Sequence, residues 1–263
     1  MIIVELCGGL GNQMFGYAAG RAISKRLNTN LVLNPFRINP RKVFVRREYS
    51  LYHFNIQEKI MARFSPLPYI MPSYAEPNFH YNPRINKIGD DTYLTGYFQS
   101  EKYFKSIEGI IRKEFTLKNP IECRPPSCCE MVSIHIRRGD YAENPEAFKV
   151  HGVLPLEYYY KAMDVIANKA DNLVFNIFAE DINWVKENFK IPYPHIFISQ
   201  GKDYQDIIRM ANCQHHIIAN SSFSWWGAWL CRNEDKIVVA PKKWFVDERM
   251  NTKDLIPEGW VRV

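Results

Sequence analysis

Two short motifs common in metal and redox proteins are missing from the chain. It has six cysteines but no C-x-x-C pair, and it contains no D-x-D motif. Histidine and carboxylate clusters at metal-binding spacing are missing too. The cysteine pattern therefore indicates neither a zinc site nor a disulfide framework, and we expect free thiols in a reducing compartment and no metal cofactor.

Long hydrophobic runs are also missing from the sequence, and its first residues do not have the pattern of a signal peptide. No apolar run approaches the ~20 residues that span a bilayer. The N-terminal stretch MIIVELCGGLGNQMF has no basic residues before its apolar ones, so it predicts a strand and a turn rather than a signal peptide. We therefore expect a cytoplasmic protein.

The composition is that of a globular protein with a mild positive charge. Its 263 residues are 46% hydrophobic, enough for a core in one large domain or two smaller ones. A net charge of +6 favours acidic small molecules or an anionic membrane surface. The densest basic stretch, residues 37–47, could lie against phospholipid or a phosphate-bearing acceptor, or form a solvated loop. No nucleic-acid-binding module is recognisable, so we expect no nucleic-acid partner.

The N-terminal half begins with a β-α-β pattern and then becomes irregular. Residues 34–92 are rich in proline and aromatic side chains and predict loops. The regular elements are predicted as a strand at 1–6, a helix at 12–27, a strand at 30–35 and a helix at 100–115. The proline-containing stretch 117–127 predicts a linker, and we place a domain boundary within it, giving domains 1–122 and 123–263.

The C-terminal half alternates strands and helices, which predicts parallel pairing with right-handed crossovers and hence a doubly wound α/β domain. In such sheets ligands bind beyond the carboxyl ends of the strands. The predicted strands are 131–136, 172–179, 195–199, 215–219 and 236–240, and the helices between them are 156–170, 182–189, 204–213 and 222–232.

The stretch SIHIRRGDY, residues 133–141, carries polar side chains along one face of the first of these strands. His135, Arg137 and Arg138 would form a compact cationic site at its carboxyl end. The planar fork of arginine suits phosphate oxygens, so a diphosphate is the ligand that this site predicts. The alternative is a structural ion pair, Arg138 with Asp140 or Arg137 with a distant carboxylate. An adhesive role for the RGD triplet is disfavoured because the triplet adjoins a core strand.

Three other strand ends carry candidate ligand contacts. The stretch NSSFSWWGAWL begins a helix with serines, and such a helix start can bind an anion. Glu180 and Asp181 follow another strand and could hold a ribose or a base, or form a solvated turn. The turn GGLGN, residues 8–12, fits neither the dinucleotide fingerprint G-x-G-x-x-G nor a P-loop.

Taken together, GGLGNQMF, HIRRGDY and NSSFSWWGAWL resemble the α1,2-fucosyltransferases, a glycosyltransferase family that uses GDP-fucose. The resemblance extends over residues 8 to about 230. It implies a GT-B-like α/β fold with two Rossmann-like domains facing across a cleft. Domain 1–122 would then lie on the acceptor side, and domain 123–263 would bind GDP-fucose, with the last residues able to pack back on the first domain.

The resemblance also assigns roles to individual residues. Arg137 would contact the diphosphate, supported by Arg138, while His135 and Asp140 would fill the other functional positions of that motif. The remaining substrate contacts that it implies are Gly9, Gly11 and Asn12 in the glycine turn, with Asn12 reaching across the cleft, Asp206 at the guanine edge, and Ser222 or Ser224 at the phosphates.

The implied reaction moves L-fucose from GDP to the 2-hydroxyl of a terminal galactose, with inversion and without a metal. Arginines would stabilise the departing diphosphate, and Asp140 or another carboxylate could serve as a weak base. The implied setting is bacterial surface-polysaccharide assembly, with a galactose-terminated glycan or lipid-linked acceptor and contact with the inner face of the membrane. Two other classes remain open: a nicotinamide-dependent oxidoreductase and a non-catalytic carbohydrate-binding module.

Overall fold

The fold is described by a computed structural model that covers residues 1–39, 47–57, 59–122, 128–198 and 201–263. Arg41, Lys42 and Arg46 of the basic stretch and residues 123–127 of the predicted linker lie outside the described residues. Within the described parts of the chain, no helix is both long and apolar enough to cross a membrane.

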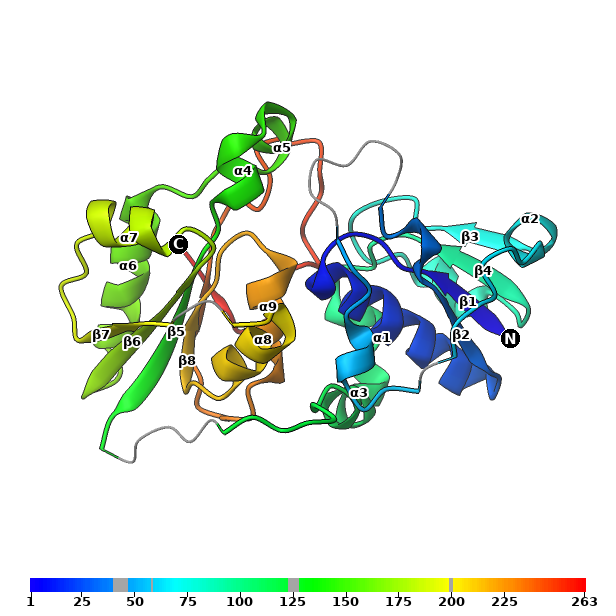
Figure 1. The fold of residues 1–263 in the computed structure, drawn as a ribbon, viewed down its shortest axis with the longest axis horizontal. Coiled ribbons are helices and arrows are strands. Elements are labelled where there is room, and N and C mark those ends of the chain that lie inside the picture. The colour runs from blue at the N-terminus through cyan, green and yellow to red at the C-terminus, as the bar shows by residue number, and fades with distance from the viewer. Residues whose placement is uncertain (40–46, 58, 123–127, 199–200) are drawn as a thin grey trace. The chain divides into compact units, whose positions relative to one another are not determined.

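The chain forms two compact units (Figure 1). Unit 1 comprises residues 1–120 and 250–257, and unit 2 comprises residues 121–249 and 258–263. The assignment of an acceptor side and a donor side to the two predicted domains stays a prediction.

Unit 1 is built on a parallel sheet of four strands in the order β2-β1-β4-β3. Its strands are β1 (Ile2–Glu5), β2 (Leu31–Asn34), β3 (Ser73–Ala75) and β4 (Thr92–Thr95). Its α-helices are α1 (Leu10–Leu27), α2 (Leu67–Ile70) and α3 (Glu108–Glu114). Short 3-10 turns occur at Pro35–Arg37, Leu51–His53, Pro83–Lys87, Glu101–Tyr103 and Lys105–Ile107.

Successive side chains of a strand point to opposite faces of the sheet, so neighbouring residues of β1 pack against different partners. On one face, α1 approaches β1 so closely that a Cβ on Gly20 would lie 2.9 Å from Leu31 Cδ1 and closer still to Val4. On the other face, Ile3 packs with Val32 and Tyr93. The close approach of α1 therefore depends on a glycine at position 20.

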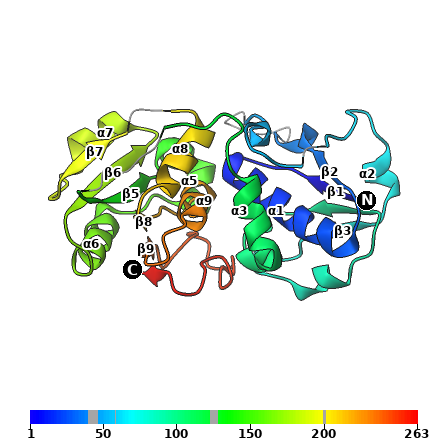
Figure 2. The same ribbon diagram turned by 90° about the horizontal axis from the view of Figure 1, so that it is seen from below.

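Helix α3 lies beside α1 (Figure 2), joined to it by a buried polar network. The Arg21 guanidinium donates to the Glu114 carboxylate at 3.0 Å, and the Tyr17 hydroxyl donates to the same carboxylate at 2.7 Å. Both charged groups are nearly buried, so each depends on the other for its hydrogen bonds.

Unit 2 is a parallel sheet of six strands in the order β10-β9-β8-β5-β6-β7. Its strands are β5 (Glu130–Ile136), β6 (Leu173–Ala179), β7 (His195–Phe197), β8 (His215–Ile217), β9 (Val238–Ala240) and β10 (Val261–Arg262). Its helices are α4 (Gly139–Glu143), α5 (Pro145–His151), α6 (Leu156–Ala167), α7 (Ile182–Asn188), α8 (Asp203–Ala211) and α9 (Ser222–Leu230).

The strand order runs outward in both directions from the β5–β8 pair, which confirms the doubly wound α/β prediction for this unit. In Figure 1, α6 and α7 lie on one side of the sheet and α8 and α9 on the other. Helices α4 and α5 lie beyond the carboxyl end of β5. The direction in which the strand order grows therefore reverses between β5 and β8.

Several sequence expectations differ from the structure. The predicted helix at 100–115 begins as two 3-10 turns and is α-helical only over Glu108–Glu114. Strands β3, β4 and β10 and helices α2, α4 and α5 were not predicted, and β3 and α2 lie within the stretch 34–92 expected to form loops. The polar face of β5 is buried, since Ser133 and His135 are each 3% exposed, and the Ser133 hydroxyl is 2.8 Å from His216 Nδ1 on β8.

Alanine at two helical glycines should change stability in opposite directions. Gly20→Ala should lower the free energy of unfolding by about 1–3 kcal/mol, because the new methyl group overlaps buried Val4 and Leu31. The matched control is Gly109→Ala in α3, where nothing lies within 4 Å of the new Cβ, and it should raise stability by about 0.5–1 kcal/mol. Urea unfolding measures both. Equal stabilities of the two variants would contradict the close packing of α1 on β1.

Candidate functional site

The candidate site of unit 2 lies where the strand order reverses, at the carboxyl ends of β5 and β8. In open parallel sheets this position forms a crevice, because the connections from the two strands leave to opposite sides. The segment after β5 supplies Arg137, Arg138 and Asp140, and the segment after β8 supplies Asn220 and Ser222.

Arg137 is held by two carboxylates. Its Nη2 donates to Asp140 Oδ1 at 2.5 Å, and its Nη1 donates to Glu180 Oε1 at the end of β6. The Tyr141 ring lies 4.8 Å from its Cζ. Among the described residues, its buried Nε has no hydrogen-bond partner. The side chain is therefore fixed in position, and Nη1 and Nη2 each keep a second hydrogen to donate.

The structure therefore contains the ion pair between Arg137 and a distant carboxylate that the sequence analysis gave as the alternative to a diphosphate site. Gly139 permits it, because a Cβ at this position, whose φ is +23°, would overlap the Glu180 carboxylate. Glycine at position 139 is thus required for Glu180, which follows β6, to approach Arg137.

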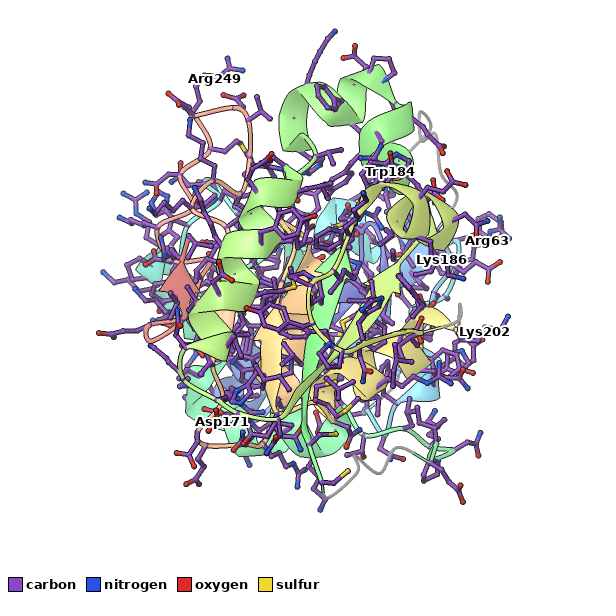
Figure 3. The ribbon with its side chains drawn as sticks, turned by 90° about the vertical axis from the view of Figure 1, so that its left-hand side faces the viewer. Arg63, Asp171, Trp184, Lys186, Lys202 and Arg249 are labelled. Atoms are coloured by element: carbon purple, nitrogen blue, oxygen red, sulfur yellow. The ribbon has the colours of Figure 1, made fainter. Side chains whose placement is uncertain are left out.

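Arg138 takes a different partner. Its Cζ lies 3.4 Å from the centre of the Trp184 ring on α7, which is labelled in Figure 3. The neighbouring Asp181 caps α7 by accepting from Trp184 N at 3.0 Å, so its carboxylate has a structural partner. Trp184 was missed at the sequence level, although an aromatic residue one turn after a strand-end acid is a signal that could have found it.

His135 adds no charge to the site at neutral pH. It is 3% exposed, with its ring 5.3 Å from that of Phe223. Burial, and then the charge of Arg137, lower the pKa of His135 from its ordinary 6.5 to about 3. The cationic trio expected from the sequence therefore reduces to two arginines.

Tyr141 and His151 form an aromatic wall that sequence reasoning missed. Their rings stack with centroids 4.3 Å apart and planes inclined by 7°. The His151 carbonyl accepts from Asn220 Nδ2 at 2.8 Å, and the same amide donates to the Trp244 carbonyl at 3.2 Å. The segment after β8 is thereby tied to the end of α5. Burial lowers the pKa of His151 to about 4, so this wall is also neutral at pH 7.

The two serine candidates differ in access. Ser221 is the N-cap of α9, and Ser222 is half-buried in its first turn. Ser224 is 1% exposed, and its hydroxyl accepts from Ala219 N at 3.2 Å and donates to the Ser221 carbonyl at 3.3 Å. This burial argues against the predicted phosphate contact for Ser224 and favours Ser222, beside the positive end of the α9 dipole.

Asp206, predicted at the guanine edge, lies on α8. One carboxylate oxygen accepts from Arg209 Nη1 at 2.8 Å, and the other accepts from Gly201 N at 3.4 Å. Burial raises its pKa despite the nearby arginine. The pair is half-buried, and whether it meets a base stays a prediction.

In unit 1, the glycine turn holds Asn12 in one orientation. The residue with a left-handed backbone is Gly8, at φ +66°, while Gly9 caps α1 and Gly11 lies inside it. Asn12 Oδ1 accepts from Gln99 Nε2 at 2.8 Å. Sequence reasoning singled out Asn12 but missed Gln99, which lies four residues after the end of β4.

Gln99 belongs to a segment that Glu76 holds in place. The Glu76 carboxylate accepts from the backbone amides of Tyr97 at 2.8 Å and Phe98 at 2.9 Å, and from the Tyr103 hydroxyl at 2.9 Å. Phe98 itself is buried at φ +50°. Glu76 thus stabilises a strained turn that positions the partner of Asn12.

Among the described residues, no group of three or more His, Cys, Asp or Glu side chains is arranged to hold a metal ion.

The whole chain resembles characterised proteins. The model of glycosyl transferase family 11 matches residues 1–263. An α1,2-colitosyltransferase of Escherichia coli is 35% identical over 100% of this chain and 99% of that protein. The O-antigen biosynthesis glycosyltransferase WbnK of Escherichia coli is 32% identical over 98% of this chain and 99% of its own length. Rat galactoside α-(1,2)-fucosyltransferase 2 is 25% identical over 88% of this chain and 67% of that protein.

A solved structure shares the fold. Fucosyltransferase NodZ from Bradyrhizobium matches with a TM-score of 0.50, at 12% identity, over 86% of this chain and 92% of that chain. The match confirms the GT-B-like α/β fold class expected from the sequence. That the two units face each other across a cleft stays a prediction.

The buried His135 should make stability fall on acidification. Its folded-state pKa of about 3 lies below its ordinary 6.5, so the unfolded state binds the proton first, and stability present above pH 6.5 is lost as the pH falls toward 3. Relative to His135→Asn, the wild type should lose about 2–3 kcal/mol between about pH 7 and pH 4.5 in urea unfolding. The exposed His195→Asn variant is the control and should follow the wild type. Parallel curves for His135→Asn and the wild type would contradict the buried, neutral histidine.

Proposed function

The chain belongs to glycosyl transferase family 11, and we propose that it transfers L-fucose from GDP-fucose to the 2-hydroxyl of a terminal galactose, inverting the anomeric carbon. The observation that carries the proposal is the guanidinium of Arg137, fixed at the carboxyl end of β5 beside Arg138. Family membership also leaves the oxidoreductase and non-catalytic alternatives without support.

Arg137 would act on the leaving diphosphate. The hydrogens on Nη1 and Nη2 that Glu180 and Asp140 leave unbonded suit two phosphate oxygens, and charge-assisted pairs of this kind are strong. As the bond from fucose to phosphate breaks, negative charge grows on the phosphate oxygens. A guanidinium already fixed in place stabilises that charge more in the transition state than in the ground state, which raises kcat.

Glu180 would exchange partners when the donor binds. Arg137 and Arg138 bring two positive charges to a site that also holds the carboxylates of Asp140 and Glu180. If one carboxylate moved away from Arg137, the local net charge would become positive, which favours binding of a negatively charged diphosphate. Glu180 is the more exposed of the two, at 37% against 18% for Asp140. In this proposal Asp140 remains as a positioning residue, while Glu180 moves to the ribose hydroxyls.

The remaining contacts follow the sequence expectations with one change. Ser222 and the amino end of α9 would bind phosphate in place of Ser224, and Asp206 would read guanine. Asn12, Gly9 and Gly11 would lie on the side of the sugar and the acceptor. No metal cofactor enters the proposal, because arginines and a helix end supply the positive charge. The acceptor would be a glycan or glycolipid of a bacterial surface polysaccharide.

Colitose is a second candidate for the transferred sugar. The 35% identical relative is named an α1,2-colitosyltransferase. Colitose differs from L-fucose only by the loss of the 3-hydroxyl, so both donors would use the same diphosphate site. A partner for that hydroxyl in this chain would decide between them, because a buried polar group left unpaired discriminates strongly.

Arg137→Lys should lower kcat by about 100-fold or more, because a point charge cannot replace two parallel hydrogen bonds. Arg137→Ala should also lose most affinity for GDP. The exposed Arg249→Lys, in the same unit, is the matched control and should keep wild-type turnover. Turnover is assayed in EDTA. An unchanged kcat in Arg137→Lys would contradict the diphosphate clamp, and loss of wild-type turnover in EDTA would contradict the metal-free proposal.

GDP-fucose should be preferred over GDP-colitose by about 100-fold or more in kcat/KM if the site hydrogen-bonds the 3-hydroxyl. Both donors are tested with the same galactose-terminated acceptor, and the product linkage is read by NMR. A preference for GDP-colitose would reassign the donor sugar and leave the diphosphate site intact. Transfer to a position other than the 2-hydroxyl would contradict the proposed linkage.

A further inference from the structure

The most exposed hydrophobic side chains of unit 1 lie on one short segment. Phe64 is 92% exposed, Tyr69 78% and Ile70 70%, and these are the three most exposed large hydrophobic residues in the described part of the chain. All three lie within seven residues of sequence, on α2 and the turn before it. A single exposed hydrophobic residue is ordinary, whereas such a concentration marks an interaction surface.

The fold holds this segment firmly while its hydrophobic side chains face solvent. Leu67 and Met71 pack toward the sheet, against the cluster of Ile3, Val32 and Tyr93. Shortly before the segment, the Met61 amide donates to the Leu33 carbonyl of β2 at 2.9 Å, and the Lys59 carbonyl accepts from the Leu33 amide at 2.8 Å. Phe64, Tyr69 and Ile70 are therefore presented by an anchored element and not by a loose end.

Positive charge surrounds these side chains. Residues 59–75 include Lys59 and Arg63 and no Asp or Glu. The Arg63 guanidinium lies 6.0 Å from the centre of the Phe64 ring, and Figure 3 shows Arg63 at the outer surface. Arg37 Nη2 donates to the Tyr69 hydroxyl at 3.3 Å, and Arg37 Nε lies 3.8 Å from Glu5 Oε2, so this third cation near α2 is partly balanced by a carboxylate. We call Arg37, Lys59, Arg63, Phe64, Tyr69 and Ile70 the α2 surface.

We propose that the α2 surface docks on an anionic phospholipid bilayer. Phe64 and Ile70 would enter the boundary between headgroups and acyl chains, where an aromatic and an aliphatic side chain leave water together. Tyr69 has the amphipathic ring that is enriched at headgroup level. Arg63 and Lys59 would meet lipid phosphates, which attract basic side chains near an anionic leaflet.

The charge complementarity selects a membrane over a second copy of this chain. The protein carries a net charge of +6, so two α2 surfaces brought face to face would place like charges together. An anionic bilayer accepts the cations and the hydrophobic side chains at once. The α2 surface shares no residue with the proposed diphosphate site in unit 2, so either proposal can fail without the other.

Vesicle flotation of the full chain tests the proposal. The protein should float with vesicles containing about 30% phosphatidylglycerol in phosphatidylcholine, and much less with phosphatidylcholine alone. The double variant Phe64→Ser with Ile70→Ser should reduce the bound fraction by about tenfold, and Arg63→Glu should reduce it by a similar factor. Ile196→Ser, which changes a 51% exposed residue of unit 2, is the matched control and should bind as the wild type does.

Two results would overturn the proposal. One is flotation that is lacking in the wild type or unchanged in the double variant. The other is a dimer in solution, measured by light scattering, that the double variant converts to a monomer, because the surface would then belong to a second copy. Equal melting temperatures and equal GDP affinities of the wild type and variants ensure that a loss of flotation reports on the surface and not on the fold.

Discussion

The fixed guanidinium of Arg137 is the interaction on which the rest of the candidate site depends. It lies between Asp140 on the following turn and Glu180 at the end of the neighbouring strand. Glu180 can approach only because residue 139 is glycine, and Asp140 is placed by the start of α4 directly after β5. Parallel pairing of β5 with β6 brings two distant parts of the chain to one edge, where their charges meet.

At the same edge, the histidine and tyrosine side chains near Arg137 are uncharged, so the charges of the site are those of the two arginines and of Asp140 and Glu180. His135 and His151 are kept uncharged by burial, and the Tyr141 ring lies against Arg137. Two arginines therefore supply the cationic charge of this site, and each is oriented by a partner before any ligand arrives. Such preorganisation lets a positive group act on developing charge without first being moved, which is how electrostatic catalysis gains its advantage.

The sequence predicted those features that depend on local pattern. Strands β5 to β9 of unit 2 follow from buried runs separated by helical spacing, and Arg137 follows from its place after β5. Strands β3 and β4 lie in or next to the stretch 34–92, whose prolines and aromatic residues predict loops, and α4 and α5 are short helices separated at Asn144, with Pro145 as the first residue of α5. A two-residue period cannot tell whether a polar face is covered, so the burial of His135 was missed. Trp184 and Gln99 act through contacts between distant segments, which one sequence does not reveal.

The most direct test of the central claim is calorimetric titration of the wild-type protein with GDP and with GMP. If Arg137 and Arg138 clamp a diphosphate, GDP should bind about 100-fold or more tightly than GMP, since the second phosphate adds charge-assisted hydrogen bonds. Equal affinities for GDP and GMP, or no binding of either, would mean that the arginines at the end of β5 have a structural role and do not bind a diphosphate.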